Sequence, residues 1–309
     1  MSTNTSGNSR TIGIEITPSR LIAVALQNGD KVSLFQAERV ESADPARQIA
    51  EFAQSAVEKF GECKAIGVAV PGLIDPISSR VAHSVRMPEH MDIDFRSLFS
   101  QIGLHVRLEN DANAAAFGEY LLGAGRGAGS MFYATIDVGV GGSFIFDGKI
   151  WRGSAGFAGE FGYVAINEDG LRLEDVASVE NIVRRTRERF NRDSTSSLGK
   201  MQEEEIGIDE IISAANEGDD LAVLMLARTG NYIGTAIASV INLLNVEKIV
   251  LGGKVMHAGG HILDSITQRA SELSFEPAFS ATKIVRGELG IEAAATGAAL
   301  LASAGDLNH

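Results

Sequence analysis

The stretch that decides the fold is Glu109-Asn110-Asp111-Ala112-Asn113-Ala114-Ala115-Ala116. It follows an apolar run, Leu104 to Leu108, that predicts a strand, and its alanines are strong helix formers. An Asn or Asp at the start of a helix accepts hydrogen bonds from the first backbone N–H groups. A second acid at this junction exceeds what a cap needs, so it is available for chemistry at the carboxyl end of a strand, where ligands of open α/β sheets bind. A plain polar cap is the alternative.

The composition limits the class of protein. The chain has 309 residues, enough for two domains, and 45% of them are hydrophobic, enough for real cores. A net charge of −13 argues against nucleic-acid binding, because phosphates need clustered Lys and Arg. The sole cysteine, Cys63, excludes a disulfide framework and indicates a reduced structural thiol. With no long apolar run and no signal-peptide core, we expect a cytoplasmic protein without membrane contact.

Two halves of the chain repeat one plan, in which a strand hairpin is followed by helices and further strands. We expect an N-terminal α/β lobe over residues 11–120, completed by the C-terminal helix 293–305, and a C-terminal α/β lobe over residues 121–292. A cleft between two such lobes suits a nucleotide held by backbone donors. The predicted strands are 11–16, 21–27, 31–40, 65–70, 131–136, 143–146 and 248–251, and the predicted helices are 45–60, 178–189, 221–244 and 293–302.

Several glycine motifs carry two interpretations each. Gly139-Val140-Gly141-Gly142 follows a strand inside a predicted glycine turn, 137–142, and is either a phosphate cradle or a bulged hairpin turn. Glu160, between Gly159 and Phe161-Gly162, suits a hydroxyl-rich ligand or lies in a solvated turn. Gly252-Gly253 lets a flat ring approach the backbone or simply ends a strand. Pro71-Gly72 alone is a weak signal for anything beyond a strand end.

Taken in order, these motifs resemble the ROK family of sugar kinases and sugar-responsive repressors. The resemblance implies an α/β, two-lobed actin/hexokinase-like (ribonuclease H-like) fold with a central interlobe cleft. The matching segments are Gly67-Val68-Ala69-Val70-Pro71-Gly72, Glu109-Asn110-Asp111-Ala112-Asn113, Gly139-Val140-Gly141-Gly142, Ala158-Gly159-Glu160-Phe161-Gly162, Val250-Leu251-Gly252-Gly253 and Thr296-Gly297-Ala298-Ala299.

The resemblance also implies roles. Asp111 matches the family's general base, which takes the proton of a sugar hydroxyl during phosphoryl transfer from ATP with Mg²⁺. The residues implied to bind the sugar are Gly72, Asn110, Glu160 and Glu174. The residues implied to bind the nucleotide are Glu15, Ser19, Arg20, Asp137, Gly139, Gly141, Gly142, Gly252 and Gly253.

The two phosphate loops depart from the family pattern. Where the family has Asp-x-Gly-Gly-Thr-Lys, this chain has Glu15-Ile16-Thr17-Pro18-Ser19-Arg20, which lacks both glycines and gains a proline without an N–H. Where the family has Gly-Thr before the second glycine motif, this chain has Asp137-Val138. The added carboxylate would repel a phosphate unless Mg²⁺ bridged the two. Both departures put ATP and Mg²⁺ binding in question.

Two further departures concern metal and sugar. The histidine that follows the family's Gly-Glu-x-Gly is Tyr163 here, and the zinc-binding cysteines are absent, so we expect no zinc. Apolar packing by Leu171 and Leu173 is the expected substitute. Arg86, in Arg86-Met87-Pro88, either selects an anionic sugar or lies on the surface. We treat His83 and His90 as surface residues.

Two functions stay open. The first is an ATP-dependent kinase of a hexose or hexose derivative, with Asp111 as its base. The second is a sugar-binding sensor of the same fold that has lost phosphoryl transfer. A repressor would need an N-terminal DNA-binding domain, and only ten residues precede the first predicted strand, Thr11 to Ile16. The resemblance allows a homodimer formed through the second lobe, and the partner implied by either function is a small-molecule sugar.

Overall fold

The structure is a computed structural model that describes residues 10–40, 44–75, 78, 80–100, 103, 105–190 and 195–304. Residues 104 and 305, which the sequence places at ends of a strand and a helix, lie outside the described residues. The chain forms two units. The first comprises Met1–Arg126, Lys149–Phe157 and Ile291–His309, and the second comprises Gly127–Gly148 and Ala158–Gly290. The hairpin residues 149–157 thus pack with the first unit, which the sequence did not indicate.

The first unit is built on a five-stranded sheet with the order β3-β2-β1-β4-β7. Strands β1, β2 and β3 form an antiparallel meander; β4 pairs with β1 in parallel, and β7 pairs with β4 in parallel. The strands are β1 (Arg10–Ile16), β2 (Arg20–Gln27), β3 (Asp30–Glu38), β4 (Cys63–Val70) and β7 (His105–Asn110), with a small separate pair, β5 (Leu73–Asp75) and β6 (Arg80–His83).

Helices cover both faces of this sheet. Helix α1 (Pro45–Phe60) begins at Asp44, whose side chain accepts from the N–H groups of Ala46 and Arg47, and ends at Gly61, as the sequence predicts. Together with α2 (Phe95–Ser100), α1 packs against Ile12, Ile14 and Ile16 of β1. Because side chains alternate along a strand, Gly13 faces the other way, toward α10 (Ala293–Ser303).

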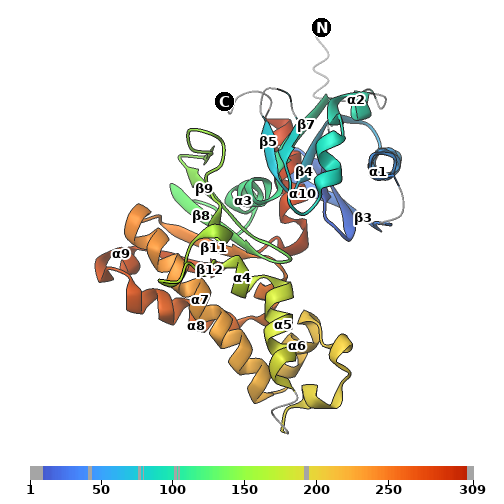
Figure 1. Ribbon diagram of the computed structural model, residues 1–309. Coiled ribbons are helices and arrows are strands. Elements are labelled where there is room, and N and C mark those ends of the chain that lie inside the picture. The colour runs from blue at the N-terminus through green and yellow to red at the C-terminus, as the bar shows by residue number, and fades with distance from the viewer. Residues whose placement is uncertain are drawn as a thin grey trace. The chain divides into compact units, whose positions relative to one another are not determined.

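Glycines let α10 lie against the sheet and against α3 (Asp111–Leu122) (Figure 1). A Cβ at Gly13 would lie 1.7 Å from the carbonyl oxygen of Ala295, and a Cβ at Gly67 would lie 1.9 Å from that of Ala298. A Cβ at Gly297 would lie 1.7 Å from the carbonyl oxygen of Ala114. No side chain fits at these contacts, so α10 packs with its backbone directly against the sheet and against α3.

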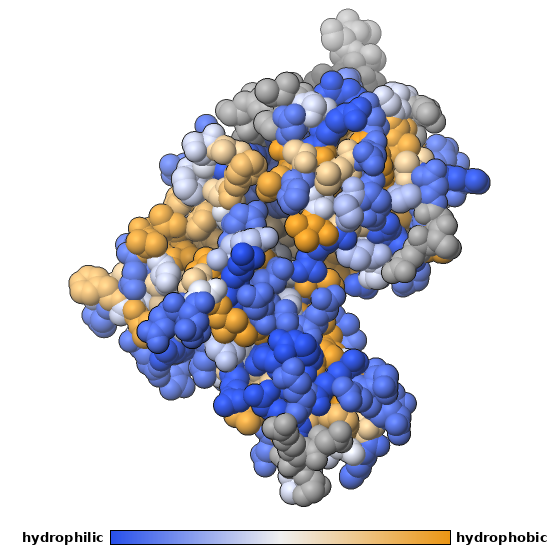
Figure 2. Space-filling view, viewed as in Figure 1, coloured by the Kyte–Doolittle hydropathy of each residue, from blue (hydrophilic) through white to orange (hydrophobic). Residues whose placement is uncertain are grey.

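The second unit holds a sheet in the order β9-β8-β11-β12, with β10 (Lys149–Trp151) following β9 through the Asp147-Gly148 turn. Its strands are β8 (Ser130–Ile136), β9 (Val140–Phe146), β11 (Lys248–Gly252) and β12 (Lys283–Arg286). Its helices are α4 (Glu174–Ala177), α5 (Val179–Phe190), α6 (Ile208–Asn216), α7 (Asp220–Leu244), α8 (Gly260–Leu273) and α9 (Glu276–Ala281). Short 3-10 turns include η2 (Phe161–Tyr163) and η5 (Lys254–Ala258). Figure 2 shows hydrophilic residues over α5 on one face.

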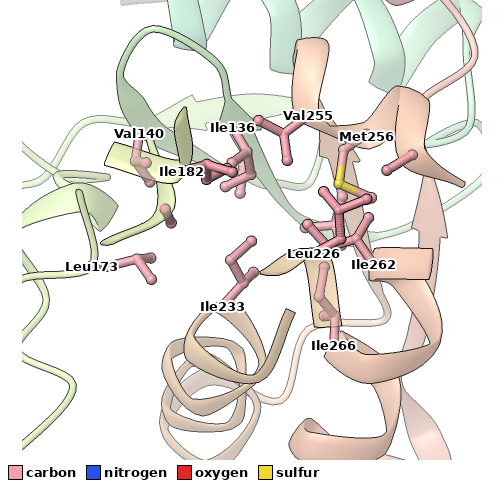
Figure 3. Packing of buried hydrophobic residues seen from close by; sticks show 14 of the residues in the cluster. Ile136, Val140, Leu173, Ile182, Leu226, Ile233, Val255, Met256, Ile262 and Ile266 are labelled. Atoms are coloured by element: carbon pink, nitrogen blue, oxygen red, sulfur yellow. The ribbon is translucent and has the colours of Figure 1, made fainter. Parts of the chain in front are cut away.

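The core of the second unit lies between its sheet and the helix pair α7 and α8. Figure 3 shows Leu173 and Ile233 pointing into this core, with Ile136 of β8 nearby. Leu173 is fully buried there, as expected for a residue that anchors the segment before α4, whereas Leu171 is only half-buried. The burial of Leu173 matters because it fixes the position of the next residue, Glu174.

Helix α7 is long and apolar enough to cross a membrane, although the sequence was expected to hold no long apolar run. Within the part of the chain that the structure describes, it is the one helix of this kind. Of its most apolar stretch, 61% is buried inside the protein, as in a core helix. Its apolar residues are therefore explained by packing against α8.

Two details correct the sequence reading. The glycine turn is shorter than 137–142, because β9 begins at Val140 and pairs Gly141 with Thr135 and Gly142 with Ala134. Gly142 is needed for packing within this strand, because a Cβ there would lie 2.8 Å from the ring of Phe132. His90 is not a surface residue: it is fully buried and packs edge-on against Phe95.

Candidate functional site

The junction of β7 and α3 holds Asn110 and Asp111 in a fixed arrangement. Asn110 is the N-cap of α3: its Oδ1 accepts from the N–H of Asn113 at 3.0 Å. Its amide nitrogen donates to the carbonyl oxygen of Gly72 at 3.0 Å and to Oδ1 of Asp111 at 3.0 Å. The same Oδ1 accepts from the N–H of Ala112 at 2.9 Å. Asn110 is thus a cap, and it also orients the half-buried Asp111 carboxylate.

Gly72 belongs to this arrangement for a conformational reason. Its φ of +127° is one that side chains rarely adopt, and a Cβ would lie 2.5 Å from the carbonyl oxygen of His83. The turn is fastened by Ser84, whose hydroxyl donates to the carbonyl oxygen of Pro71 at 2.9 Å. The structure therefore brings together three residues predicted for the site, Gly72, Asn110 and Asp111, all within the first unit.

A buried acid next to the junction was not assigned a role from the sequence. Glu109 is 5% exposed, and its Oε1 accepts from the N–H of Asn110 and from the side-chain amide of Asn113, both at 3.1 Å. Its Oε2 pairs with the guanidinium of Arg152, which lies just after β10. A usable signal was in the sequence, because a carboxylate at a buried strand end requires a cation.

The predicted first phosphate loop is a closed turn between β1 and β2. The N–H of Thr17 donates to the carbonyl oxygen of Arg20, and the N–H of Arg20 donates to the Thr17 hydroxyl, both at 2.9 Å. Pro18 has no N–H. The guanidinium of Arg39, whose side chain is 8% exposed, donates to the carbonyl oxygens of Thr17 and Pro18 at 3.2 and 3.4 Å. Glu15, Ser19 and Arg20 therefore flank a turn whose donors are largely engaged.

In the second unit, two carboxylates of the chain accept hydrogen bonds from backbone N–H groups of the predicted glycine loops. Asp137 accepts from the N–H of Val138 through Oδ1 and from the N–H of Lys254 through Oδ2, each at 2.8 Å. Glu174 Oε2 accepts from the N–H of Val140 at 2.9 Å. Gly253, with φ +89°, lies against the strand that precedes Asp137. Asp137, Glu174 and the two glycine loops at 139–142 and 252–253 therefore gather in one place.

The backbone beside Glu160 lies against the glycine loop of β9. A Cβ at Gly159 would lie 2.2 Å from the carbonyl oxygen of Gly142, and a Cβ at Gly162 would lie 3.3 Å from Oε2 of Glu174. Glu160 is exposed and begins the 3-10 turn η2. The glycines at 159 and 162 therefore let the Glu160 segment approach β9 and Glu174 closely.

The family's zinc site does not fit the residues present here. Among the residues that the structure describes, no group of His, Cys, Asp or Glu is arranged to hold a metal ion. Where a zinc ligand would stand, Tyr163 stacks under the guanidinium of Arg172 at 4.6 Å. The segment folds back on itself through the bridge between Ala165 and Arg172 and the N–H of Leu173, which donates to the carbonyl oxygen of Val164 at 2.9 Å. Hydrogen bonds and stacking thus hold this segment together.

Comparison with known proteins places these features in a family. The ROK family model matches residues 16–304. A glucokinase of Halalkalibacterium halodurans is 35% identical over 216 residues, which are 66% of this chain and 65% of that protein. A xylose repressor of Caldicellulosiruptor bescii is 29% identical over 71% of this chain and 57% of the repressor. The chain thus spans less than two thirds of the length of these two relatives.

A solved structure is similar over the whole described fold. The crystal structure of a ROK family glucokinase from Streptomyces griseus, in complex with glucose and AMPPNP, has a TM-score of 0.84 and 28% sequence identity. It covers 96% of this chain and 100% of that one. The expected actin/hexokinase-like α/β fold is confirmed. Since the family model and this structure both span nearly the whole sequence, the chain belongs to the ROK family.

Proposed function

We propose that this chain is an ATP-dependent kinase of a hexose or a hexose derivative. The observation that carries the proposal is the β7–α3 junction, where Asn110 both caps the helix and holds the Asp111 carboxylate. A base must be positioned before it can act, and this arrangement supplies the positioning from backbone and amide groups. The glucokinases among the relatives, one of them solved with glucose and AMPPNP, support the same reaction.

In the proposed reaction, Asp111 takes the proton of a sugar hydroxyl as that oxygen attacks the γ-phosphorus of ATP, and ADP leaves. Mg²⁺, when bound, would neutralise charge on the transferring phosphate. Magnesium sites of this kind use one or two carboxylates together with phosphate oxygens and water. Asp137 is the carboxylate of the glycine loop, yet both of its oxygens already accept backbone N–H groups. Asp137 therefore fits a positioning role better than that of a metal ligand.

The sugar is proposed to contact Gly72, Asn110, Glu160 and Glu174. These groups offer carbonyl, amide and carboxylate oxygens, which are the acceptors that a hydroxyl-rich ligand needs. Glu174 directly follows Leu173, which is fully buried and points into the core (Figure 3). Asn110 and Glu174 are already held by hydrogen bonds to the backbone, which lowers the cost of ordering them when sugar binds.

One observation favours a second candidate, a sugar-binding sensor without phosphoryl transfer. In the first phosphate loop, the N–H groups of Thr17 and Arg20 are used inside the turn and Pro18 has none. A phosphate cradle depends on such donors. The relatives include xylose repressors, which are regulatory proteins by name. This candidate keeps the sugar site and gives up ATP.

Nucleotide-coupled turnover separates the two candidates. The protein is incubated with Mg-ATP and a panel of hexoses, amino sugars and N-acetyl sugars, and ADP release is followed for the wild type and Asp111→Asn. For the kinase we expect sugar-dependent ADP that falls by about 10²–10⁴-fold in the variant. Ser303→Ala, at the exposed end of α10, is the control and should leave turnover unchanged. Equal ADP release from wild type and Asp111→Asn would contradict the proposal.

Ligand-induced stabilisation tests the sensor directly. A sugar that raises the melting temperature, with no effect of ATP and no ADP release, supports the sensor and rejects the kinase. If neither sugar nor nucleotide changes the melting temperature, both candidates fail. The change in melting temperature follows the ratio of ligand concentration to dissociation constant, so it also ranks the sugars.

Two further parts of the proposal concern where and in what state the protein works. We propose a cytoplasmic location and a homodimer formed through the second unit. The exposed apolar side chains of Leu243 and Phe275, which are 80% and 70% exposed, support an association surface there. Light scattering of the wild type and Phe275→Asp checks the dimer: a monomeric wild type would contradict it.

A further inference from the structure

Asp137 makes hydrogen bonds to the backbone of several separate segments. Its carboxylate accepts from the N–H groups of Val138 and Lys254. Its own N–H donates to the carbonyl oxygen of Gly139, and its carbonyl oxygen accepts from the N–H of Val179, both at 2.8 Å. One half-buried residue therefore joins the end of β8, the glycine loop, the loop after β11 and the start of α5.

These contacts join segments that are far apart in the sequence. Asp137 and Lys254 are separated by 117 residues. Lys254 follows Gly253, and a Cβ at Gly253 would lie 2.3 Å from the carbonyl oxygen of Ile136. The backbone of the second glycine loop thus touches the last residue of β8, and the carboxylate of the next residue, Asp137, accepts a hydrogen bond from the same loop. Hydrogen bonds to a charged acceptor are the stronger kind.

The chemistry of the side chain suits this role. A carboxylate has two acceptor oxygens and can serve two N–H donors at once. An asparagine has one acceptor oxygen, and its NH₂ group would face one of the two N–H groups. A glycine, which the family pattern has at this part of the loop, would leave both donors without the carboxylate.

We infer that Asp137 is a positioning residue that clasps the two nucleotide loops, 137–142 and 252–254, to each other. The inference rests on the proposed function, because that function is what assigns these loops to the nucleotide. In this role Asp137 neither repels the phosphates as a nearby anion nor binds magnesium. The clasp holds the loops at a fixed spacing, so its loss affects nucleotide binding rather than sugar binding.

The first test uses Asp137→Asn, with Asp147→Asn in the exposed β9–β10 turn as the charge-matched control. Amide hydrogen exchange of Val138 and Lys254 is measured by NMR in the absence of any ligand. We expect their protection to fall by about tenfold or more in Asp137→Asn, the loss expected for a charge-assisted hydrogen bond. Val140, whose N–H is bonded to Glu174, should keep its protection. Unchanged exchange at Val138 and Lys254 would overturn the clasp.

A second variant removes the donor instead of the acceptor and guards against a misfolded Asp137→Asn. Lys254 is the first residue of η5, a position where proline is tolerated, so Lys254→Pro removes its N–H with little other change. Lys254→Ala keeps the N–H and loses only the ion pair with Asp209, at 2.6 Å. We expect faster exchange at Val138 in Lys254→Pro and wild-type exchange in Lys254→Ala. Equal exchange rates of the Val138 amide in the two variants would contradict the inference.

Nucleotide binding gives the functional readout. In Asp137→Asn we expect the KM for ATP, or its dissociation constant without sugar, to rise about tenfold while the KM for sugar stays within about twofold. Tighter ATP binding in Asp137→Asn would overturn the inference, because it would make Asp137 a competing anion. If the wild type binds no nucleotide, the proposed kinase function fails, and the exchange data alone decide whether the clasp exists.

Discussion

Arg152 and Glu109 form an ion pair between the segment after β10 and the end of β7, beside Asp111. The Glu109 side chain is 7% exposed and that of Arg152 is 31% exposed. The other oxygen of Glu109 accepts from Asn113 and Asn110, so the pair supports the junction that presents Asp111. A buried carboxylate is tolerated here because the guanidinium and the amides together satisfy it.

Removing the cation should cost more than removing the pair. We expect Arg152→Met to destabilise the protein by about 2–3 kcal/mol, since it leaves Glu109 buried without its partner. Arg152→Met combined with Glu109→Gln should recover part of that loss, because the amide no longer carries a charge. Urea unfolding of both single variants and the double variant measures this. Strictly additive effects would show that the pair is not coupled.

The contact between α3 and α10 should not tolerate a side chain. A Cβ at Gly297 would lie 1.7 Å from the carbonyl oxygen of Ala114, a backbone atom that cannot move independently. We expect Gly297→Ala to destabilise by about 3 kcal/mol or more and to lower sugar turnover by displacing Asp111. Ser303→Ala, near the end of the same helix, should change stability by less than about 0.5 kcal/mol. A mild effect of Gly297→Ala would mean that the helices separate easily.

Arg39 should stabilise the first turn through its contacts with two carbonyl oxygens. We expect Arg39→Met to cost about 1–2 kcal/mol, because Thr17 and Pro18 lose their charged donor. Arg47→Met is the control: its exposed pair with Glu51, one helical turn away in α1, should be worth only about 0.3–0.5 kcal/mol. Thermal unfolding of the two variants compares them, and equal losses would rule out a special role for Arg39.

His90 should make stability depend on pH. Burial is the main cause that lowers the pKa of His90 to about 4; the charge of Glu89 opposes this shift and that of Arg39 adds to it. The unfolded state, with a pKa near 6.5, therefore binds the proton first, and stability falls as pH drops from about 6.5 toward 4. We expect the free energy of unfolding to fall by about 2 kcal/mol between pH 7 and pH 5.

The variant that checks this is His90→Leu, which keeps an apolar side chain against Phe95 and cannot titrate. Its free energy of unfolding should lose most of the pH dependence between pH 7 and pH 5. Urea unfolding at several pH values provides the measurement. A wild-type slope that persists in His90→Leu would assign the pH dependence to other groups.

Zinc removal should have no effect. The segment that precedes Glu174 is held by the Ala165–Arg172 bridge, the Tyr163–Arg172 stack and the burial of Leu173. We expect chelators to leave the melting temperature unchanged and elemental analysis to find no stoichiometric zinc. Loss of stability on chelation would mean that a metal takes part in folding this segment.

The local sequence predicted the elements whose signals lie within a few residues. Asp44 and Gly61 mark the two ends of α1, and Asn110 caps α3, because capping depends only on neighbouring backbone groups. The order of glycine and acidic motifs along the chain was enough to predict the ROK family, which the comparisons confirm. The glycine turn was placed too long, because the pairing of β9 with β8 outweighs the preference of glycine for turns.

Contacts between distant residues were decided only by the tertiary structure. Arg152 meets Glu109 across 43 positions and Asp137 meets Lys254 across 117, and no local pattern encodes such partners. The burial of His90 likewise follows from how the 3-10 turn Pro88–Asp92 packs on Phe95. Backbone propensities act within a helical turn or a hairpin. The environment of a side chain is set by which distant segments the folded chain brings beside it.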